Sequence, residues 1–152
     1  MNASCRNWYP HVTVAAVVMD QGRLLLIEES IEGNLVLNQP AGHLEPGESL
    51  IEAVVRETLE ESGWTIRPTD LIGIYQWKDD DQSNFIRFAF AAEPLSHDPT
   101  RALDQGIVRT LWMTPTELQA TSARHRSREV WRAVADYLIG IRQPLDMLHY
   151  RS

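Results

Sequence analysis

Three glutamates, Glu57, Glu60 and Glu61, are spaced so that they can act together on a cation. On a helix, the i, i+3, i+4 spacing places their carboxylates on one stripe, where like charges cost roughly 0.2–0.5 kcal/mol per pair. Carboxylates are ligands for magnesium or manganese, and bound magnesium usually shares its shell with substrate phosphates. The spacing therefore predicts a divalent-metal site that acts on phosphate. The alternative is a solvated acidic helix face.

The segment that carries these glutamates has the start and stop signals of a helix. Ser49 and Glu52 form a capping-box pattern, and Gly63 suits the left-handed residue that ends many helices. Glu57 and Glu61 each follow an apolar residue by seven positions, whereas solvated acids should lie opposite the apolar arc. At about 100° per residue that arc comprises Leu50, Ile51, Val54, Val55, Thr58 and Leu59. This placement favours the metal site over the solvated face.

Residues 42–64 resemble the Nudix box, whose pattern is G-x5-E-x7-R-E-U-x-E-E-x-G-U, where U is bulky and apolar. The matching positions are Gly42, Glu48, Arg56, Glu57, Glu60, Glu61, Gly63 and Trp64. Thr58 occupies an apolar slot of the pattern, where its methyl group can still pack. The resemblance implies an α/β fold, specifically an α/β/α sandwich with a mixed sheet and the box helix laid along it.

The resemblance also implies roles for residues of the box. Glu57, Glu60 and Glu61 would bind the metal, with Glu57 also serving as the general base, and the backbone carbonyl of Ala41 would complete the metal shell. Glu48 and Arg56 resemble an internal ion pair that ties the loop to the helix. Removing one partner of such a partly buried pair leaves the other charge uncompensated.

The expected reaction is attack of water on one phosphorus of a diphosphate linkage. Anionic oxygens shield this phosphorus, so metal ions are needed to neutralise charge and to acidify a bound water. A nearby carboxylate that accepts the proton typically contributes about 10²- to 10⁴-fold.

Size and composition are consistent with one soluble domain spanning residues 1–152, with a hydrophobic fraction of 43%. The net charge of −7 argues against a nucleic-acid polymer as partner, because such proteins usually present a basic face. No apolar run approaches the roughly 20 residues that span a bilayer, and residues 1–6 contain no apolar signal core. With Cys5 as the only cysteine, we expect a cytoplasmic protein without an internal disulfide. Whether it is a monomer or a homodimer stays open.

The remaining elements alternate imperfectly between strands and helices. We expect strands over residues 11–20, 23–28, 35–38, 71–78, 85–92 and 107–113. Thr114 and Glu117 form a second capping box with proline at the first helical position, and a last helix spans 127–141. The first two strands form an antiparallel hairpin, which predicts a mixed sheet.

Several further residues are candidates for substrate binding. Arg87 lies in mid-strand beside an aromatic residue and suits a phosphate or a stacked ring, although it could also be an ordinary surface arginine. Tyr75 and Trp77 share a strand face and could stack on a ring, or simply pack. Asn38 and Gln39 border the loop that enters the box, where they could bind substrate or only shape the loop.

Other polar residues have weaker claims. Many Nudix enzymes draw an extra acid from the loop before the last strand, so Asp104 is added to the metal ligands, with a solvated turn as the alternative. The run Asp79–Asp81 looks like a second metal site, yet acidic runs on loops are usually hydrated. We expect a structural role for His11.

Within the family, the chain resembles the NudJ phosphatase subgroup from about residue 10 onward. The similar segments are residues 10–15, 28–29, 38–45, 75–77, 85–88 and 144–145. Two features depart from that subgroup, namely Leu37 at a position that often holds tryptophan, and the acidic run Asp79–Asp81.

The subgroup resemblance implies a magnesium-dependent phosphatase. Its substrates would be nucleoside tri- and diphosphates and thiamine-type pyrophosphates, with release of orthophosphate. One alternative is a pyrophosphohydrolase that sanitises oxidised nucleoside triphosphates and releases pyrophosphate. Another is a non-catalytic ligand-binding module with the same fold, although such proteins commonly lose acids of the box and here none is lost.

Overall fold

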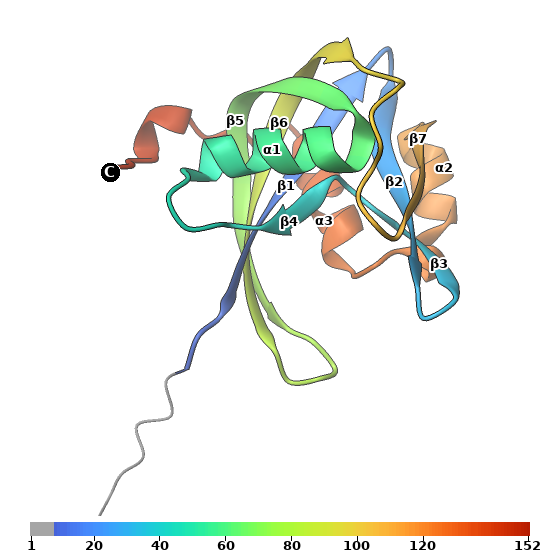
Figure 1. Cartoon of the computed structure of the whole chain (residues 1–152), viewed down its shortest axis with the longest axis horizontal. Helices are drawn as coiled ribbons and strands as arrows, with labels where there is room; N and C mark the ends of the chain where they lie inside the picture. Colours follow the sequence, from blue (N-terminus) through green and yellow to red (C-terminus); the bar gives the residue numbers. More distant parts are fainter. Residues whose placement is uncertain (1–7) are drawn as a thin grey trace, which may run out of the picture.

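The computed structural model describes residues 8–152, so Cys5 and residues 1–6 lie outside the described part. Figure 1 shows a twisted sheet with helices packed against it. The strands are β1 His11–Asp20, β2 Arg23–Ile31, β3 Asn34–Asn38, β4 Ala41–His43, β5 Trp64–Lys78, β6 Asn84–His97 and β7 Ile107–Met113. The helices are α1 Leu50–Ser62, α2 Pro115–Ala120 and α3 Glu129–Leu138, with the short 3-10 turns η1 Ser122–Arg124 and η2 Leu145–Met147.

The seven strands form one mixed sheet with the order β3-β2-β1-β6-β5, in which β4 pairs with β1 and β7 with β2. Strands β1 and β6 run parallel, and the other strand pairs of residues 8–152 are antiparallel. The predicted mixed sheet is therefore confirmed.

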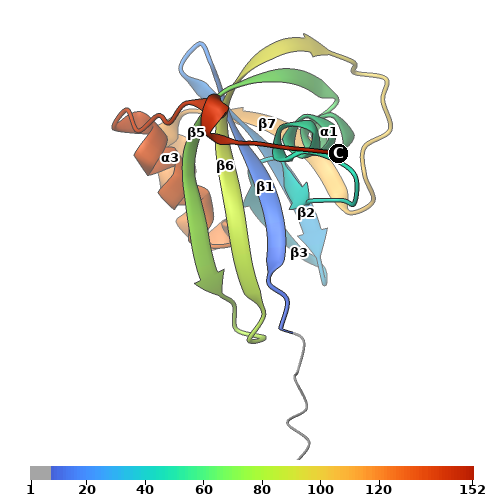
Figure 2. The same ribbon diagram turned by 90° about the vertical axis from the view of Figure 1, so that its left-hand side faces the viewer.

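The sheet separates two apolar clusters because successive strand residues point to opposite faces. Val14, Ala16 and Val18 of β1 pack under α1, whereas Val17 of β1 packs on the face covered by α2 and α3. Figure 2 shows α1 and α3 on opposite sides of the strands. This is the predicted α/β/α sandwich, and it fixes α1 along the sheet.

Both predicted capping boxes are present. The Ser49 hydroxyl accepts from the backbone N–H of Glu52, whose carboxylate accepts from the N–H of Ser49, and Thr114 and Glu117 repeat this exchange in α2. Gly63 ends α1 with a φ of 73°, a left-handed conformation that glycine adopts without steric cost.

Several predicted boundaries were wrong. Strands β5 and β6 have 15 and 14 residues, so both are much longer than the predicted 71–78 and 85–92. Register shifts between the two strands break the alternation of side chains with a period of two, which is the pattern used to predict strands. The loop that enters the box contains a short strand that was not predicted, β4, which is held by pairing to β1. Helix α3 is shorter than residues 127–141 and ends before Gly140, whose φ is 90°.

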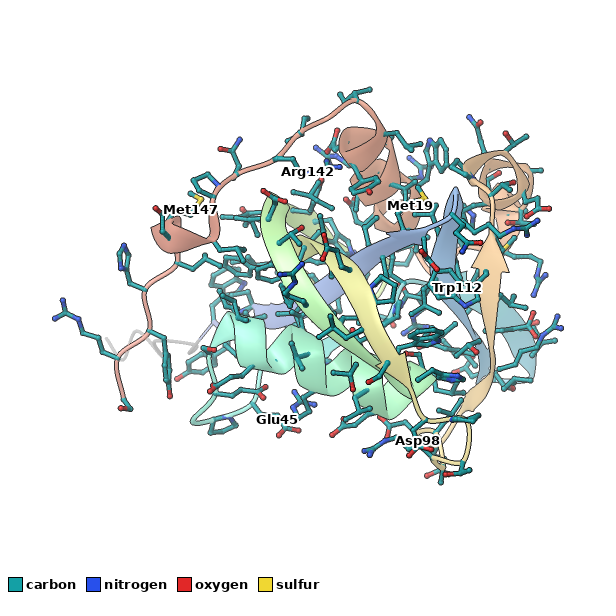
Figure 3. All side chains as sticks on the ribbon, turned by 90° about the horizontal axis from the view of Figure 1, so that it is seen from above. Met19, Glu45, Asp98, Trp112, Arg142 and Met147 are labelled. Carbon is teal, nitrogen blue, oxygen red and sulfur yellow. The ribbon has the colours of Figure 1, made fainter. Side chains whose placement is uncertain are left out.

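No helix within residues 8–152 combines the length and hydropathy needed to cross a membrane. Figure 3 shows the chain from above, with the polar side chains around α1 and around the loop that contains Asp98. The loop that contains Asp98 connects β6 to β7.

Candidate active site

Three carboxylates converge at the end of α1. Glu57 and Glu60 project from the helix, Asp104 comes from the loop between β6 and β7, and one oxygen of each lies within 4.8 Å of the others. The backbone N–H of Asp104 donates to the carbonyl of Glu60 at 3.0 Å, which holds the loop against the helix. We call these three residues the acid cluster.

Gly42 leaves the space that the acid cluster needs. A Cβ at this position would lie 2.1 Å from the carboxyl carbon of Glu57, so any side chain would displace that carboxylate. Burial raises the pKa of Glu57, and Glu60 and Asp104 raise it further, while Arg56 opposes them. The crowded acids are thus costly to ionise together unless a cation accompanies them.

Glu61 lies outside the acid cluster and holds β4 against α1. Its carboxylate, which is 6% exposed, accepts from the backbone N–H of Ala41 at 2.7 Å. Burial, followed by the charges of Glu29, Glu57 and Asp104, raises its pKa to about 9. The negative charge of Glu61 is therefore disfavoured unless positive charge is brought close to it.

Arg56 connects the box loop to the acid cluster. Its guanidinium bonds both oxygens of Glu48, at 2.7 and 2.9 Å, and pairs with Glu57 at 2.8 Å and Glu60 at 3.1 Å. A further N–H donates to the carbonyl of His43 at 3.0 Å. The Glu48–Arg56 pair is therefore part of a larger network that orients two acids of the cluster.

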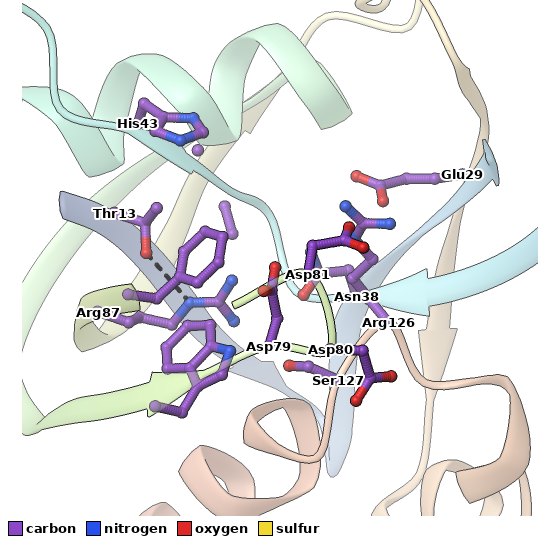
Figure 4. Close-up of a pocket in the computed structure, with 14 residues that line it drawn as sticks. Thr13, Glu29, Asn38, His43, Asp79, Asp80, Asp81, Arg87, Arg126 and Ser127 are labelled. Carbon is purple, nitrogen blue, oxygen red and sulfur yellow. Dashed lines mark hydrogen bonds between the residues drawn. The ribbon is translucent and has the colours of Figure 1, made fainter. Parts of the chain in front are cut away.

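A cavity of about 430 Å³ opens beside β4 (Figure 4). Ala41 and Gly42, which contact Glu61 and Glu57, form part of its wall. The other walls come from β1, β2, β3, the β5–β6 hairpin and the segment after η1. The cavity therefore adjoins the acid cluster.

Arg87 and Trp77, both predicted to bind substrate, line this cavity. Arg87 is 6% exposed and its Nε makes one long bond of 3.5 Å to Thr13, while Nη1 has no partner in the described part of the chain. Burial lowers its pKa to about 10. The guanidinium lies 5.2 Å from the ring centre of Trp77, which stacks on Phe85 at 5.0 Å. A buried cation beside an aromatic surface suits a polar ring or an anion.

Tyr75 and Gln39, also predicted to bind substrate, are not among the residues that line the cavity. The Tyr75 hydroxyl donates to Asp136 of α3 at 2.6 Å, because α3 covers this part of the face that Tyr75 shares with Trp77. The Gln39 amide is buried and donates to the carbonyl of Val130 at 2.6 Å. Both side chains join the strands to α3, and their roles in substrate binding stay predictions.

The remaining candidates are placed as follows. Asn38 and all of Asp79–Asp81 line the cavity. His11 is exposed, stacks on Phe85 with ring centres 4.9 Å apart and lies 3.3 Å from a ring nitrogen of His43.

Sequence reasoning missed six residues that line the cavity, namely Thr13, Glu29, His43, Phe85, Arg126 and Ser127. Glu29 could have been found, because two successive acids in an otherwise apolar strand are unusual. Its neighbour Glu28 is bound by Arg109 and Arg124, whereas burial raises the pKa of Glu29. The segment after η1 has no sequence signal, since only tertiary contact brings it to the cavity.

The domain pattern described as NUDIX matches residues 9–134. The chain belongs to the Nudix family. It is 43% identical over 140 residues to Phosphatase NudJ of Escherichia coli K12, across 91% of this chain and 90% of that protein. The predicted resemblance to the NudJ subgroup is confirmed, and so is the prediction that the protein is a Nudix hydrolase.

Solved structures agree with this assignment. A Nudix hydrolase from Nitrosomonas europaea is 47% identical, with a TM-score of 0.92 over 94% of this chain and 98% of the other. A UDP-X diphosphatase structure is 18% identical, with a TM-score of 0.70 over 90% and 66%, and shows the shared fold alone.

Proposed function

We propose that this Nudix hydrolase is a magnesium-dependent phosphatase. Its substrates would be nucleoside tri- and diphosphates and thiamine-type pyrophosphates, from which it releases orthophosphate. The observation that carries this proposal is the acid cluster, with its oxygens within 4.8 Å of one another, beside a cavity that can hold an organic group. The similarity to Phosphatase NudJ supports the choice of product. The single cysteine supports a cytoplasmic location.

The residues present fit a magnesium or manganese ion. Three carboxylates offer hard oxygen ligands, and Gly42 provides room for one of them. Glu57, Glu60 and Asp104 would hold the ion, with Glu61 and the carbonyl of Ala41 beside them. When bound, such an ion neutralises phosphate oxygens and acidifies water.

The side chains of this protein would perform the other steps. Glu57 would accept the proton of the attacking water, a role that suits a half-buried carboxylate with a raised pKa. Arg56 holds Glu57 and Glu60 in place through bonds of 2.8 and 3.1 Å. Glu61 fixes β4, and with it the cavity wall, against α1.

The cavity would bind the organic part of the substrate. Trp77 offers an aromatic surface, and Arg87 has an unpaired N–H that can donate to an oxygen or ring nitrogen. The diphosphate would then extend toward Gly42 and the acid cluster, where the reaction takes place.

A substrate panel tests the proposal. Nucleoside tri- and diphosphates, oxidised nucleoside triphosphates and thiamine diphosphate are incubated with magnesium or manganese, and orthophosphate and pyrophosphate are measured separately. Orthophosphate supports the phosphatase. Pyrophosphate with a nucleoside monophosphate would instead identify a nucleotide-sanitising pyrophosphohydrolase, and tight binding without any turnover would identify a ligand-binding module.

A further inference from the structure

The loop of the β5–β6 hairpin brings three carboxylates to the mouth of the cavity. Asp79, Asp80 and Asp81 all line it (Figure 4). One oxygen of Asp79 accepts from the backbone N–H of Ser83 at 2.8 Å and so fixes the turn. Asp80 and Asp81 are exposed, and neither forms an ion pair with any residue of the described part of the chain. We call Asp79–Asp81 the acidic rim.

Inside the rim, polar atoms lack partners. Nη1 of Arg87, Oδ1 of Asn38 and Oγ of Ser127 are buried without a hydrogen bond to any of residues 8–152, and all three side chains line the same cavity. An unsatisfied buried polar group costs about 1–3 kcal/mol. Arg87 can only donate, so the atom that satisfies it must be an acceptor. These atoms indicate a ligand with a polar inner edge.

The charges of the lining restrict that ligand. Glu29, Asp79, Asp80 and Asp81 contribute four negative charges, Arg87 and Arg126 two positive ones, and −4 plus +2 leaves −2 when all are ionised. Asp80 and Asp81 are the exposed carboxylates of the lining and Arg126 is its exposed cation, while Arg87 is only 6% exposed. The rim therefore repels a diphosphate, which leaves it the acid cluster, where a divalent cation would be held.

We propose that the acidic rim determines substrate specificity by charge. It admits a neutral or positively charged organic group, whose inner edge accepts from Arg87, and it disfavours an organic group that carries additional negative charge. This inference depends on the proposed function, because the diphosphate must lie at the acid cluster for the organic group to face the rim.

The expected size of the effect follows from exposure. Each exposed charge pair contributes about 0.2–1 kcal/mol, and salt weakens it. Two rim carboxylates together should therefore change the relative kcat/KM of charged and neutral substrates by about twofold to thirtyfold at low ionic strength.

The test removes the two exposed rim charges and keeps Asp79, which shapes the loop. The variant D80N/D81N is compared with the control D20N/D146N, which changes net charge equally at exposed sites that do not line the cavity. The substrates are thiamine diphosphate, ADP, and ADP that carries an extra phosphate on its ribose. Initial rates with magnesium yield kcat/KM, and calorimetry yields dissociation constants.

In the wild type and the control, ADP should be preferred over its phosphorylated derivative. In D80N/D81N this preference should fall about twofold to thirtyfold, and the preference for thiamine diphosphate over ADP should also fall. In about 0.5 M salt, the substrate preferences of wild type and variant should become similar, because charges are then screened within a few ångströms.

Equal ratios in D80N/D81N, the control and the wild type would overturn the specificity role while hydrolysis itself remained. Absence of hydrolysis would instead refute the proposed function. The ratios of dissociation constants would then still decide whether the rim selects by charge.

Discussion

Two arginines, Arg56 and Arg87, occupy opposite environments in the same protein. Arg56 reaches Glu48, Glu57 and Glu60 and the carbonyl of His43, all within 3.1 Å. Arg87 is buried with one hydrogen bond of 3.5 Å, and its Nη1 has no partner among the residues that the structure describes. Bonds to Glu48 and Glu57 raise the pKa of Arg56, whereas burial lowers that of Arg87.

The difference distinguishes an arginine that holds the structure together from an arginine that is available to bind a ligand. The five N–H donors of Arg56 are matched by five oxygen atoms, so this guanidinium has no donor left and serves to position the acids around it. A buried guanidinium with an unused donor costs stability until something binds, and such cost is common at functional sites. Mutating each arginine should therefore have opposite consequences for stability.

The largest effect is expected at Glu61, whose carboxylate interacts with the charges of Glu57 and Glu29 and lies between the helix and the cavity. Glu61→Gln should reduce metal-dependent phosphate release by at least about 10⁴-fold, equivalent to about 5.5 kcal/mol, because the amide cannot supply negative charge. Phosphate release is measured with magnesium, and circular dichroism checks that the fold is retained. Full activity would remove Glu61 from the mechanism.

A matched control for this substitution is Glu52→Gln. Glu52 lies on the same helix and is exposed, with its carboxylate on the N-cap. Activity should be unchanged, and any loss would indicate that the assay reports helix stability.

Breaking the hydrogen-bond network around Arg56 should have the next largest effect. Arg56→Gln leaves Glu48, Glu57 and Glu60 without compensation, and we expect a loss of about 3–5 kcal/mol in the free energy of unfolding. Urea denaturation measures it. Arg67→Gln, which removes an exposed ion pair with Glu93, should cost less than about 1 kcal/mol. Similar losses in both variants would contradict the distinction.

Glu28 allows the pH dependence of stability to be tested at a second buried ion-pair network. Glu28 is buried between Arg109 and Arg124, and their hydrogen bonds lower its pKa from 4.5. Its contribution to stability is therefore fully present above about pH 4.5 and is lost as pH falls through the lowered value. Glu28→Gln should cost about 1–3 kcal/mol at pH 7.

Denaturation curves collected from pH 7 down to about pH 3 check this prediction. The wild type should lose stability more steeply than Glu28→Gln below about pH 4.5, so the two should converge. Parallel pH profiles would show that Glu28 is not the group responsible.

The smallest expected effect on stability is at Arg87. Arg87→Leu should leave the free energy of unfolding unchanged or raise it by about 1 kcal/mol, since it removes an incompletely paired buried cation. It should also raise KM by about tenfold, as expected for one lost hydrogen bond to a charged donor. Denaturation and steady-state kinetics measure the two. A large loss of stability would show that Arg87 is structural, like Arg56.

Much of the acid cluster could be anticipated because its information is local. Glu57 and Glu60 are one helical turn apart, and the capping residues Ser49 and Gly63 define that helix by contacts within a few positions. Even Gly42, distant by fifteen positions from Glu57, belongs to the same short motif.

The cavity was harder to foresee. Tyr75 and Trp77 share one strand face, yet α3 covers Tyr75 while Trp77 borders the cavity. The alternation along the strand is the same for both residues, so it could not distinguish them. Arg126 and Ser127 reach the cavity because the N–H of Arg126 donates to the carbonyl of Leu37. Register shifts in β5 and β6 also hide their full length from a period of two.

By itself, the sequence determined the chemistry: the family motif, its carboxylates and the helix that displays them depend on spacing within a single turn or loop. Only the tertiary structure decided what surrounds that chemistry. Asp104 lies beside Glu57 and Glu60, whereas Glu61 bonds to β4. Arg87 is buried with one N–H that has no partner in residues 8–152. These placements depend on how segments distant in sequence pack together.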